Sequence, residues 1–162
     1  MKIPPNFEFV HNDLVVRGFF DQYRWLSNMF PTPLYYEGEF FPSSENAYQA
    51  AKWPKEDHWP NARSYFKGCS PFQAKTKGQT AKLSADWETR KIEVMRSVLR
   101  AKFANEQMKR ALLATGQKYL EEKNWWGDHF WGKVDGIGQN QLGHLLMEVR
   151  DEVRKTCEVR GY

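Results

Sequence analysis

The hydrophobic and polar positions of this chain follow a helical spacing over most of its length. Apolar residues recur every three or four positions through 87–103 and again through 142–153, the spacing that keeps one face of a helix buried. The helices expected from this spacing and from the flanking residues span 45–52, 61–67, 71–78, 85–103, 105–115 and 140–156. Most of the chain is therefore expected to be helical.

Two pairs of short apolar runs near the N-terminus predict β-hairpins. Residues 7–10 and 14–20 flank the polar segment His11-Asn12-Asp13, and residues 34–36 and 39–41 flank a turn that contains glycine. An isolated hairpin is marginally stable in water, so both are expected to pack against helices. We therefore expect a mainly α fold: a single compact helical domain with short β-hairpins near the N-terminus.

The residues at the expected helix ends support these boundaries. A serine of Pro42-Ser43-Ser44 can cap the first helix, and Pro54 is expected to end it. Ser70 and Gln73 have the spacing of a capping box around a proline at the first helical position. Ser84 is expected to cap the next helix.

Length and composition indicate a water-soluble globular protein. The 162 residues correspond to one domain, which we expect to span residues 1–162. Hydrophobic residues make up 41% and charged residues 27%, which excludes disordered and low-complexity proteins. No apolar run approaches the roughly 20 residues of a membrane span, and the first residues lack a signal-peptide core. Because the only cysteines are Cys69 and Cys157, we exclude a disulfide framework and expect a cytoplasmic protein.

The charge and the aromatic content point weakly to an anionic partner. The net charge is +4, and aromatic residues make up 15% of the chain, including seven Trp. A basic protein attracts phosphates or nucleic acids, but the same charge can serve solubility alone. Lysine and arginine are spread over every segment rather than gathered in one stripe, which argues against a dedicated nucleic-acid surface.

The first candidate site is one face of the helix that follows Pro42. Glu45, Tyr48, Gln49 and Lys52 lie within about 100° of one another around the helix axis. Alanines occupy the opposite side, at positions 47, 50 and 51. The polar face is either exposed to solvent or lines a cleft, and the spacing alone leaves both interpretations open.

The second candidate site is a glycine-rich loop. Five of the eleven glycines lie between positions 127 and 143, interleaved with Trp and Asp residues. Such a loop, entering a helix at Gln139 or Asn140, is expected to offer free amides to an anion. It matches neither a Walker loop nor a dinucleotide fingerprint. The alternative is a tight loop in which the Trp side chains simply pack.

Two further observations limit the chemistry. Ser27 and Asn28 interrupt an apolar stretch, either as turn residues or as substrate contacts. The four His are scattered without the spacing of metal ligands, so we expect neither a metal nor another cofactor.

Several blocks of the sequence resemble a known family. Ser27-Asn28, followed by Pro42-Ser43-Ser44-Glu45-Asn46-Ala47-Tyr48-Gln49-Ala50-Ala51-Lys52, is similar to the signature of the YbiA-like, or NADAR, family. The other matching blocks are Trp87–Lys91, Val94-Met95, Ala101–Phe103, Leu112–Gly116, Asp128, Trp131-Gly132, Gly138–Gly143, Leu146-Met147 and Arg150. The resemblance covers about 19–154, which we take as the core of the domain.

The resemblance implies a mainly α, one-domain N-glycosidase that breaks a bond between ribose C1 and nitrogen. One branch of the family acts on phosphorylated riboflavin-pathway intermediates that carry a ribosylamino-pyrimidine, and another removes ADP-ribose from guanine bases. It implies that Glu45, Lys52, Asp128, Trp131 and Asn140 line the site. The remaining residues expected to bind substrate are Ser27, Asn28, Tyr48, Gln49, Gly132 and Gly138.

This chemistry suits the residue types. Cleavage develops positive charge on the sugar, which a carboxylate stabilises while a second acidic group prepares water or protonates the leaving nitrogen. Glu45 and Asp128 are the two candidates, with their roles left open. Lys52 is expected to hold a phosphate or to act as a Schiff-base amine. Trp131 is expected to stack on the base, and the loop at Gly138 to hold phosphate.

Three functions are therefore considered. The first is hydrolysis of a phosphorylated ribosyl small molecule. The second is removal of ADP-ribose from guanine, with ADP-ribosylated DNA as a possible partner. The third, from another class, is a non-catalytic module that binds NAD or ADP-ribose. No membrane partner is expected.

Overall fold

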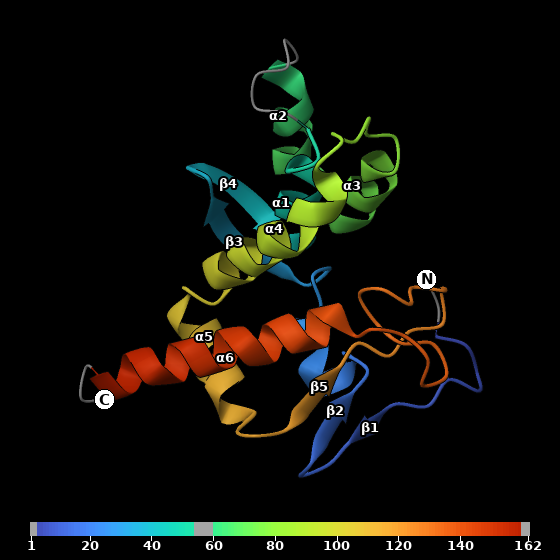
Figure 1. The fold of residues 1–162 in the computed structure, drawn as a ribbon, viewed down its shortest axis with the longest axis vertical. Helices are drawn as coiled ribbons and strands as arrows, with labels where there is room; N and C mark the ends of the chain where they lie inside the picture. The colour runs from blue at the N-terminus through green and yellow to red at the C-terminus, as the bar shows by residue number, and fades with distance from the viewer. Residues whose placement is uncertain (1–2, 54–59, 160–162) are drawn as a thin grey trace. The chain divides into compact units, whose positions relative to one another are not determined.

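The computed structural model describes residues 3–53 and 60–159, which divide into two compact units. The first unit combines residues 3–27 with residues 109–159, and the second holds residues 28–108. Figure 1 shows the elements of each unit. Every helix in the described part of the chain is too short or too polar to span a bilayer.

The second unit is a hairpin surrounded by helices. Its elements are β3 (Pro31–Tyr36), β4 (Glu39–Ser43), α1 (Ser44–Ala50), α2 (Pro60–Gly68), α3 (Pro71–Gly78) and α4 (Trp87–Lys102). Alternate residues of β3 are buried, and its buried face packs against α4, whose Met95, Val98 and Leu99 are also buried. Helix α1 follows β4 directly and contacts α2, α3, α4 and both strands, so all of its residues are buried.

The first unit is built on a three-stranded sheet. Its elements are β1 (Val10–His11), β2 (Val15–Arg17), the 3-10 helix η1 (Asp21–Leu26), β5 (Tyr119–Glu121) and α6 (Gln141–Val159). Strand β2 pairs antiparallel with β1 and parallel with β5, in the order β1-β2-β5. Helix α6 runs beside β5 (Figure 1). Helix α5 (Glu106–Ala114) begins in the second unit and ends in the first.

The expectation of a mainly α fold is wrong. Helices hold about half of the described residues, and five strands form two sheets, so the protein is a mixed α/β structure. Both predicted hairpins are present. The sequence pattern missed β5, a strand of three residues without alternation, because its stability comes from pairing with a segment about 100 residues away. The single domain expected over residues 1–162 stays a prediction.

Two of the predicted helix starts are confirmed and one is wrong. Ser43 caps α1, and Ser70 forms the capping box of α3 with Gln73. Helix α4 begins two residues later than expected, because Ser84 lies in the preceding turn and Asp86 occupies the N-cap. Pro54 lies outside the described residues.

The close packing of α6 on β5 predicts the effect of a single methyl group. A Cβ atom at Gly143 would lie 2.1 Å from the carbonyl oxygen of Leu120. We expect Gly143→Ala to lower the free energy of unfolding by about 1–3 kcal/mol, the usual cost of overpacking. Gly68→Ala is the control, because a Cβ there meets no atom of the described residues within 4 Å. Urea denaturation measures both, and equal midpoints for the two variants would contradict the packing argument.

Candidate active site

Helix α1 carries the predicted catalytic carboxylate, and two side chains fix its position. The Ser43 hydroxyl oxygen accepts a hydrogen bond from the backbone amide of Asn46. The Asn46 side chain donates through Nδ2 to the carbonyl oxygens of Phe66 (2.8 Å) and Cys69 (2.9 Å). Because Asn46 is fully buried, these bonds fix the rotation of α1 and therefore the direction of Glu45.

The polar face of α1 is buried. Glu45 is 8% exposed and Gln49 is 5% exposed, so the interpretation of this face as solvated is wrong. Helices α3 and α4 pack against α1, which explains the burial. Burying a carboxylate is costly unless it is hydrogen-bonded, and here Gln49 Nε2 donates to Glu45 Oε1 at 2.8 Å.

Gly78 makes room for the side chain that holds Glu45. A Cβ atom at position 78 would lie 1.7 Å from Gln49 Oε1, so a larger residue would displace this amide. The Lys52 amine also donates to the Gly78 carbonyl oxygen at 3.5 Å. The sequence indicated Gly78 only as a helix end, since its contact with Gln49 joins two helices that are separate in the chain.

Lys52 lies just beyond α1, because the helix ends at Ala50 and not at residue 52 as predicted. Burial lowers the pKa of the Lys52 ammonium, the Glu45 carboxylate opposes this shift, and Lys75 adds to it. The ammonium lies 5.6 Å from the centre of the Tyr48 ring, which itself packs against Trp87. The net effect is a lysine that loses its proton at a lower pH than an ordinary lysine.

Three buried polar groups next to Glu45 find no partner among the described residues. Asn28 is held through its backbone, because its carbonyl oxygen accepts from the amide of Glu45 at 3.0 Å. Within the described part of the chain, its side-chain oxygen Oδ1 has no hydrogen-bond partner, and neither does Ser44 Oγ or Gln49 Oε1. All three side chains are at least nine-tenths buried. Since buried polar atoms are nearly always hydrogen-bonded, these three atoms call for an explanation, such as strain, a bound water or a polar ligand.

In the first unit, Asp128 organises a tight turn. Its Oδ1 accepts hydrogen bonds from the amides of Phe130 (3.1 Å) and Trp131 (2.8 Å). The side chain of buried Asn124 fixes the Asp128 backbone: its Oδ1 accepts from the Asp128 amide, and its Nδ2 donates to the Asp128 carbonyl oxygen. Within residues 3–53 and 60–159, no protein group bonds to the second carboxylate oxygen, Oδ2.

The glycine-rich loop does not present free amides at the start of α6. The backbone amides of Gln139, Asn140, Gln141 and Leu142 donate to the carbonyl oxygens of His129, Gly132, Phe130 and Trp131, respectively. The expected anion site on these amides is therefore wrong, because the loop itself uses them. Gly138 is required for this close folding: its φ is +144°, and a Cβ there would lie 2.3 Å from the Gly132 carbonyl oxygen.

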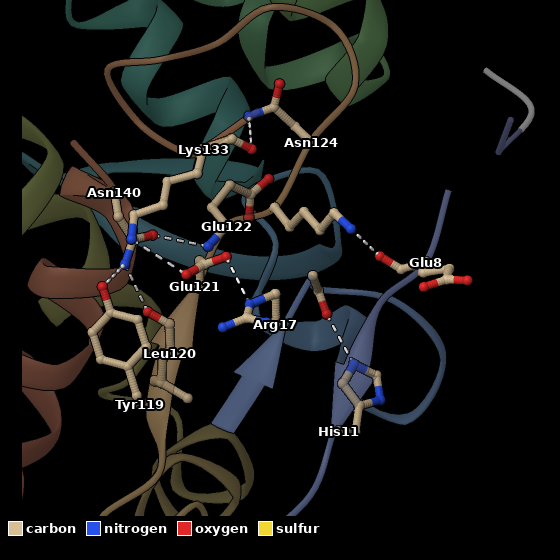
Figure 2. Close-up of polar contacts among 12 residues, drawn as sticks. Glu8, His11, Arg17, Tyr119, Leu120, Glu121, Glu122, Asn124, Lys133 and Asn140 are labelled. Atoms are coloured by element: carbon tan, nitrogen blue, oxygen red, sulfur yellow. Dashed lines mark hydrogen bonds and ion pairs between the residues drawn. The ribbon is translucent and has the colours of Figure 1, made fainter. Parts of the chain in front are cut away.

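Asn140 ties this loop to strand β5. It is fully buried, and its Oδ1 accepts from the Glu122 amide at 2.9 Å. Its Nδ2 donates to Tyr119 Oη at 3.0 Å and to the Leu120 carbonyl oxygen at 2.9 Å (Figure 2). These bonds give Asn140 a structural role, and its contact with substrate stays a prediction.

The predicted site residues fall into two groups. The second unit holds Asn28, Glu45, Tyr48, Gln49 and Lys52, which lie on or next to α1. The first unit holds Ser27, Asp128, Trp131, Gly132, Gly138 and Asn140. Ser27 ends η1, and its amide donates to the Arg24 carbonyl oxygen. The catalytic and binding roles expected for all of these residues stay predictions.

Sequence reasoning missed a cavity of about 300 Å³ in the second unit. Its lining includes Tyr36, Trp53, Arg63 and Arg90. Burial, aided by the charge of Glu37, raises the pKa of Tyr36 to about 12. These residues come from separate elements, so no local motif signals them.

Among the described residues, no group of three or more His, Cys, Asp or Glu side chains is placed to hold a metal ion.

Comparison with known proteins agrees with the predicted family. A model of the NADAR domain matches residues 10–154. The chain is 36% identical over 140 residues to N-glycosidase YbiA of Escherichia coli, covering 82% of this chain and 83% of that protein. It is 30% identical over 143 residues to an N-glycosidase of Nostoc punctiforme, covering 86% and 91%.

Two further comparisons bear on fold and pathway. The NMR structure of E. coli YbiA superposes with a TM-score of 0.76 at 32% identity, covering 93% of this chain and 91% of that chain. A riboflavin biosynthesis protein of Vibrio vulnificus is 34% identical over 137 residues, which span 83% of this chain and 37% of that protein.

These relatives confirm the enzyme class expected from the sequence, a hydrolase of N-glycosyl compounds. The match extends over nearly the whole described chain, in sequence and in fold. The chain belongs to the NADAR domain family.

Proposed function

We propose that the protein hydrolyses the bond between ribose C1 and nitrogen in a phosphorylated ribosyl compound, such as a ribosylamino-pyrimidine intermediate of riboflavin synthesis. The relatives named as N-glycosidases support the reaction, and the riboflavin biosynthesis protein of V. vulnificus supports the substrate class. The observation that carries the proposal is the buried Glu45 carboxylate with unpaired polar oxygens around it.

Glu45 has the properties of a group that stabilises an oxocarbenium-like sugar. Its carboxylate is buried and held by Gln49, so it needs little reorganisation when positive charge develops at ribose C1. Fixed electrostatic groups of this kind contribute roughly 3–4 kcal/mol to catalysis.

The unpaired oxygens near Glu45 favour a sugar as the bound group. Asn28 Oδ1 and Gln49 Oε1 are acceptors only, so they require donors from the ligand. Ribose hydroxyls supply such donors, whereas an ionised phosphate supplies only acceptors. The Ser44 hydroxyl can bond to either kind of group.

Asp128 and Trp131 complete the proposal. The Asp128 oxygen that bonds to backbone amides fixes the side chain, and the other is the proposed acid or base for water and the leaving nitrogen. Trp131 is proposed to stack on the leaving base. A non-catalytic ADP-ribose-binding module would not require a buried carboxylate fixed in this way.

The first test replaces the proposed electrostatic group. Glu45→Gln keeps the shape and an acceptor for Gln49 but removes the negative charge, so we expect kcat to fall by about 10²–10⁴-fold. Glu88→Gln, on the exposed side of α4, is the matched control and should keep full activity. Release of the free base is followed by chromatography. Full activity of a correctly folded Glu45→Gln would remove Glu45 from the mechanism.

The second test uses the lowered pKa of Lys52. The unfolded chain binds the Lys52 proton more tightly than the folded protein. The free energy of unfolding of the wild type therefore rises with pH between the lowered pKa of Lys52 and 10.5. We expect the stability of wild type relative to Lys52→Met to increase over that window and to stay constant at lower pH. Urea unfolding at a series of pH values measures this, and a difference independent of pH would contradict it.

Chemical trapping distinguishes the two proposed roles of Lys52, a Schiff-base amine and a phosphate-binding cation. If Lys52 acts as an amine, borohydride added during turnover reduces a Schiff base and leaves a sugar covalently bound to Lys52. If it holds phosphate as a cation, no adduct forms and Lys52→Met raises KM for the phosphorylated substrate. Mass spectrometry of the treated protein distinguishes the two roles.

The third test concerns the substrate. A phosphorylated ribosylamino-pyrimidine and ADP-ribosylated guanine are offered at equal concentration, and we expect faster release of the pyrimidine. Faster release of guanine would make the protein an ADP-ribosyl-guanine glycohydrolase. Binding of ADP-ribose with no release from either compound would favour a non-catalytic module.

A further inference from the structure

A second polar cavity lies in the first unit, beside strand β5. It has a volume of about 310 Å³ and is lined by Arg17, Glu121, Lys123, Lys133, Asp135 and Gly136. Asp135 and Gly136 belong to the glycine-rich loop, whereas Arg17, Glu121, Lys123 and Lys133 were not among the predicted site residues. Three cations face two carboxylates in this small space, which leaves one positive charge in excess.

Backbone pairing brings these charges together. The parallel register of β2 and β5 places Arg17 opposite Glu121. Lys123 and Lys133 are partners in an isolated parallel bridge, supported by a hydrogen bond from the Asn124 amide to the Lys133 carbonyl oxygen (2.8 Å). Like charges directly opposite each other are destabilising unless a counter-charge is bound.

Glu121 is a buried counter-ion for two of the cations. Its side chain is 5% exposed, with Oε1 at 3.0 Å from Arg17 Nε and Oε2 at 3.4 Å from Lys133 Nζ. Figure 2 shows Glu121 between these two side chains. Both carboxylate oxygens are therefore occupied by cations. The negative charge of Glu121 holds these cations in place, and its repulsion of an anionic ligand is reduced.

The cations keep donors for a ligand. Within the described residues, the Arg17 guanidinium bonds only to Glu121 and only through Nε, which leaves its two terminal nitrogens for an anion. Lys123 donates one hydrogen bond to the Glu8 carbonyl oxygen at 2.5 Å, and an ammonium has three donors. The Arg17 guanidinium and the Lys133 ammonium meet at the Glu121 carboxylate, and Lys123 lines the same cavity. Such a set of cations suits the oxygens of a phosphate.

We propose that this cavity binds the phosphate group of a phosphate ester, with Arg17, Lys123 and Lys133 as its ligands. The amides of residues 139–142 are occupied by carbonyl oxygens of the loop itself, so side-chain cations take the role that those amides do not. The inference rests on the proposed function only for the source of the phosphate, which is either the substrate or a separate phosphorylated ligand.

The test measures phosphate binding without turnover. Inorganic phosphate and ribose 5-phosphate are titrated into the full chain by calorimetry, with ribose as the uncharged control. Removing one charge-assisted contact should weaken binding by about tenfold or more in Arg17→Gln and Lys133→Gln. Lys123→Glu should abolish phosphate binding. Because Lys123 makes no ion pair with Glu121, this variant tests the site even if the other two variants fold poorly. Lys155→Gln on the exposed face of α6 removes the same charge elsewhere and should bind as wild type.

The outcomes are distinct. Loss of phosphate binding in Lys123→Glu but not in Lys155→Gln supports the site. No binding by wild type, or equal binding by both variants, overturns it. Where the site is supported, a rise in KM for the phosphorylated substrate alone assigns the phosphate to the substrate, and an unchanged KM assigns it to a separate ligand. Since binding is measured apart from hydrolysis, an inactive protein that binds phosphate would overturn only the proposed function.

Discussion

The hydrogen bond from Gln49 to Glu45, inside a helix with no exposed residue, is the interaction on which the candidate site depends. A buried carboxylate must be paired or it takes up a proton, and here the pairing requires Gly78 to lack a side chain. Ser43 and Asn46 hold the helix that carries it. The part of the candidate site in the second unit is therefore built by three helices around one carboxylate.

The unpaired oxygens around that carboxylate run against the rule that buried polar atoms are satisfied. The surrounding contacts keep Asn28 and Gln49 in place through their other atoms, so their free oxygens are held in fixed directions. Proteins tolerate such a cost where a ligand supplies the missing partners. On the proposed function, binding of a sugar would therefore stabilise the second unit.

In the first unit, the groups available to an anion are side-chain cations and not the backbone amides at the start of α6. Its glycine-rich loop folds so tightly that the carbonyl oxygens of the loop satisfy the first amides of α6. Gly132, Gly138 and Gly143 permit these close approaches, and Asn140 ties them to β5. Glycines in this loop therefore serve backbone packing, while positive charge comes from side chains around Glu121.

The amino-acid sequence by itself determined the hairpins, most helix boundaries and the family, because these depend on local spacing, capping residues and ordered motifs. It also placed Glu45, Tyr48 and Gln49 on one face of α1, since helical geometry is local, although the helix ends before Lys52. Only the tertiary structure decided that this face is buried, that β5 joins β2, and that the loop amides are occupied. Each of these depends on contacts between distant segments, and those contacts are governed by packing and by the satisfaction of buried polar groups, which no local pattern records.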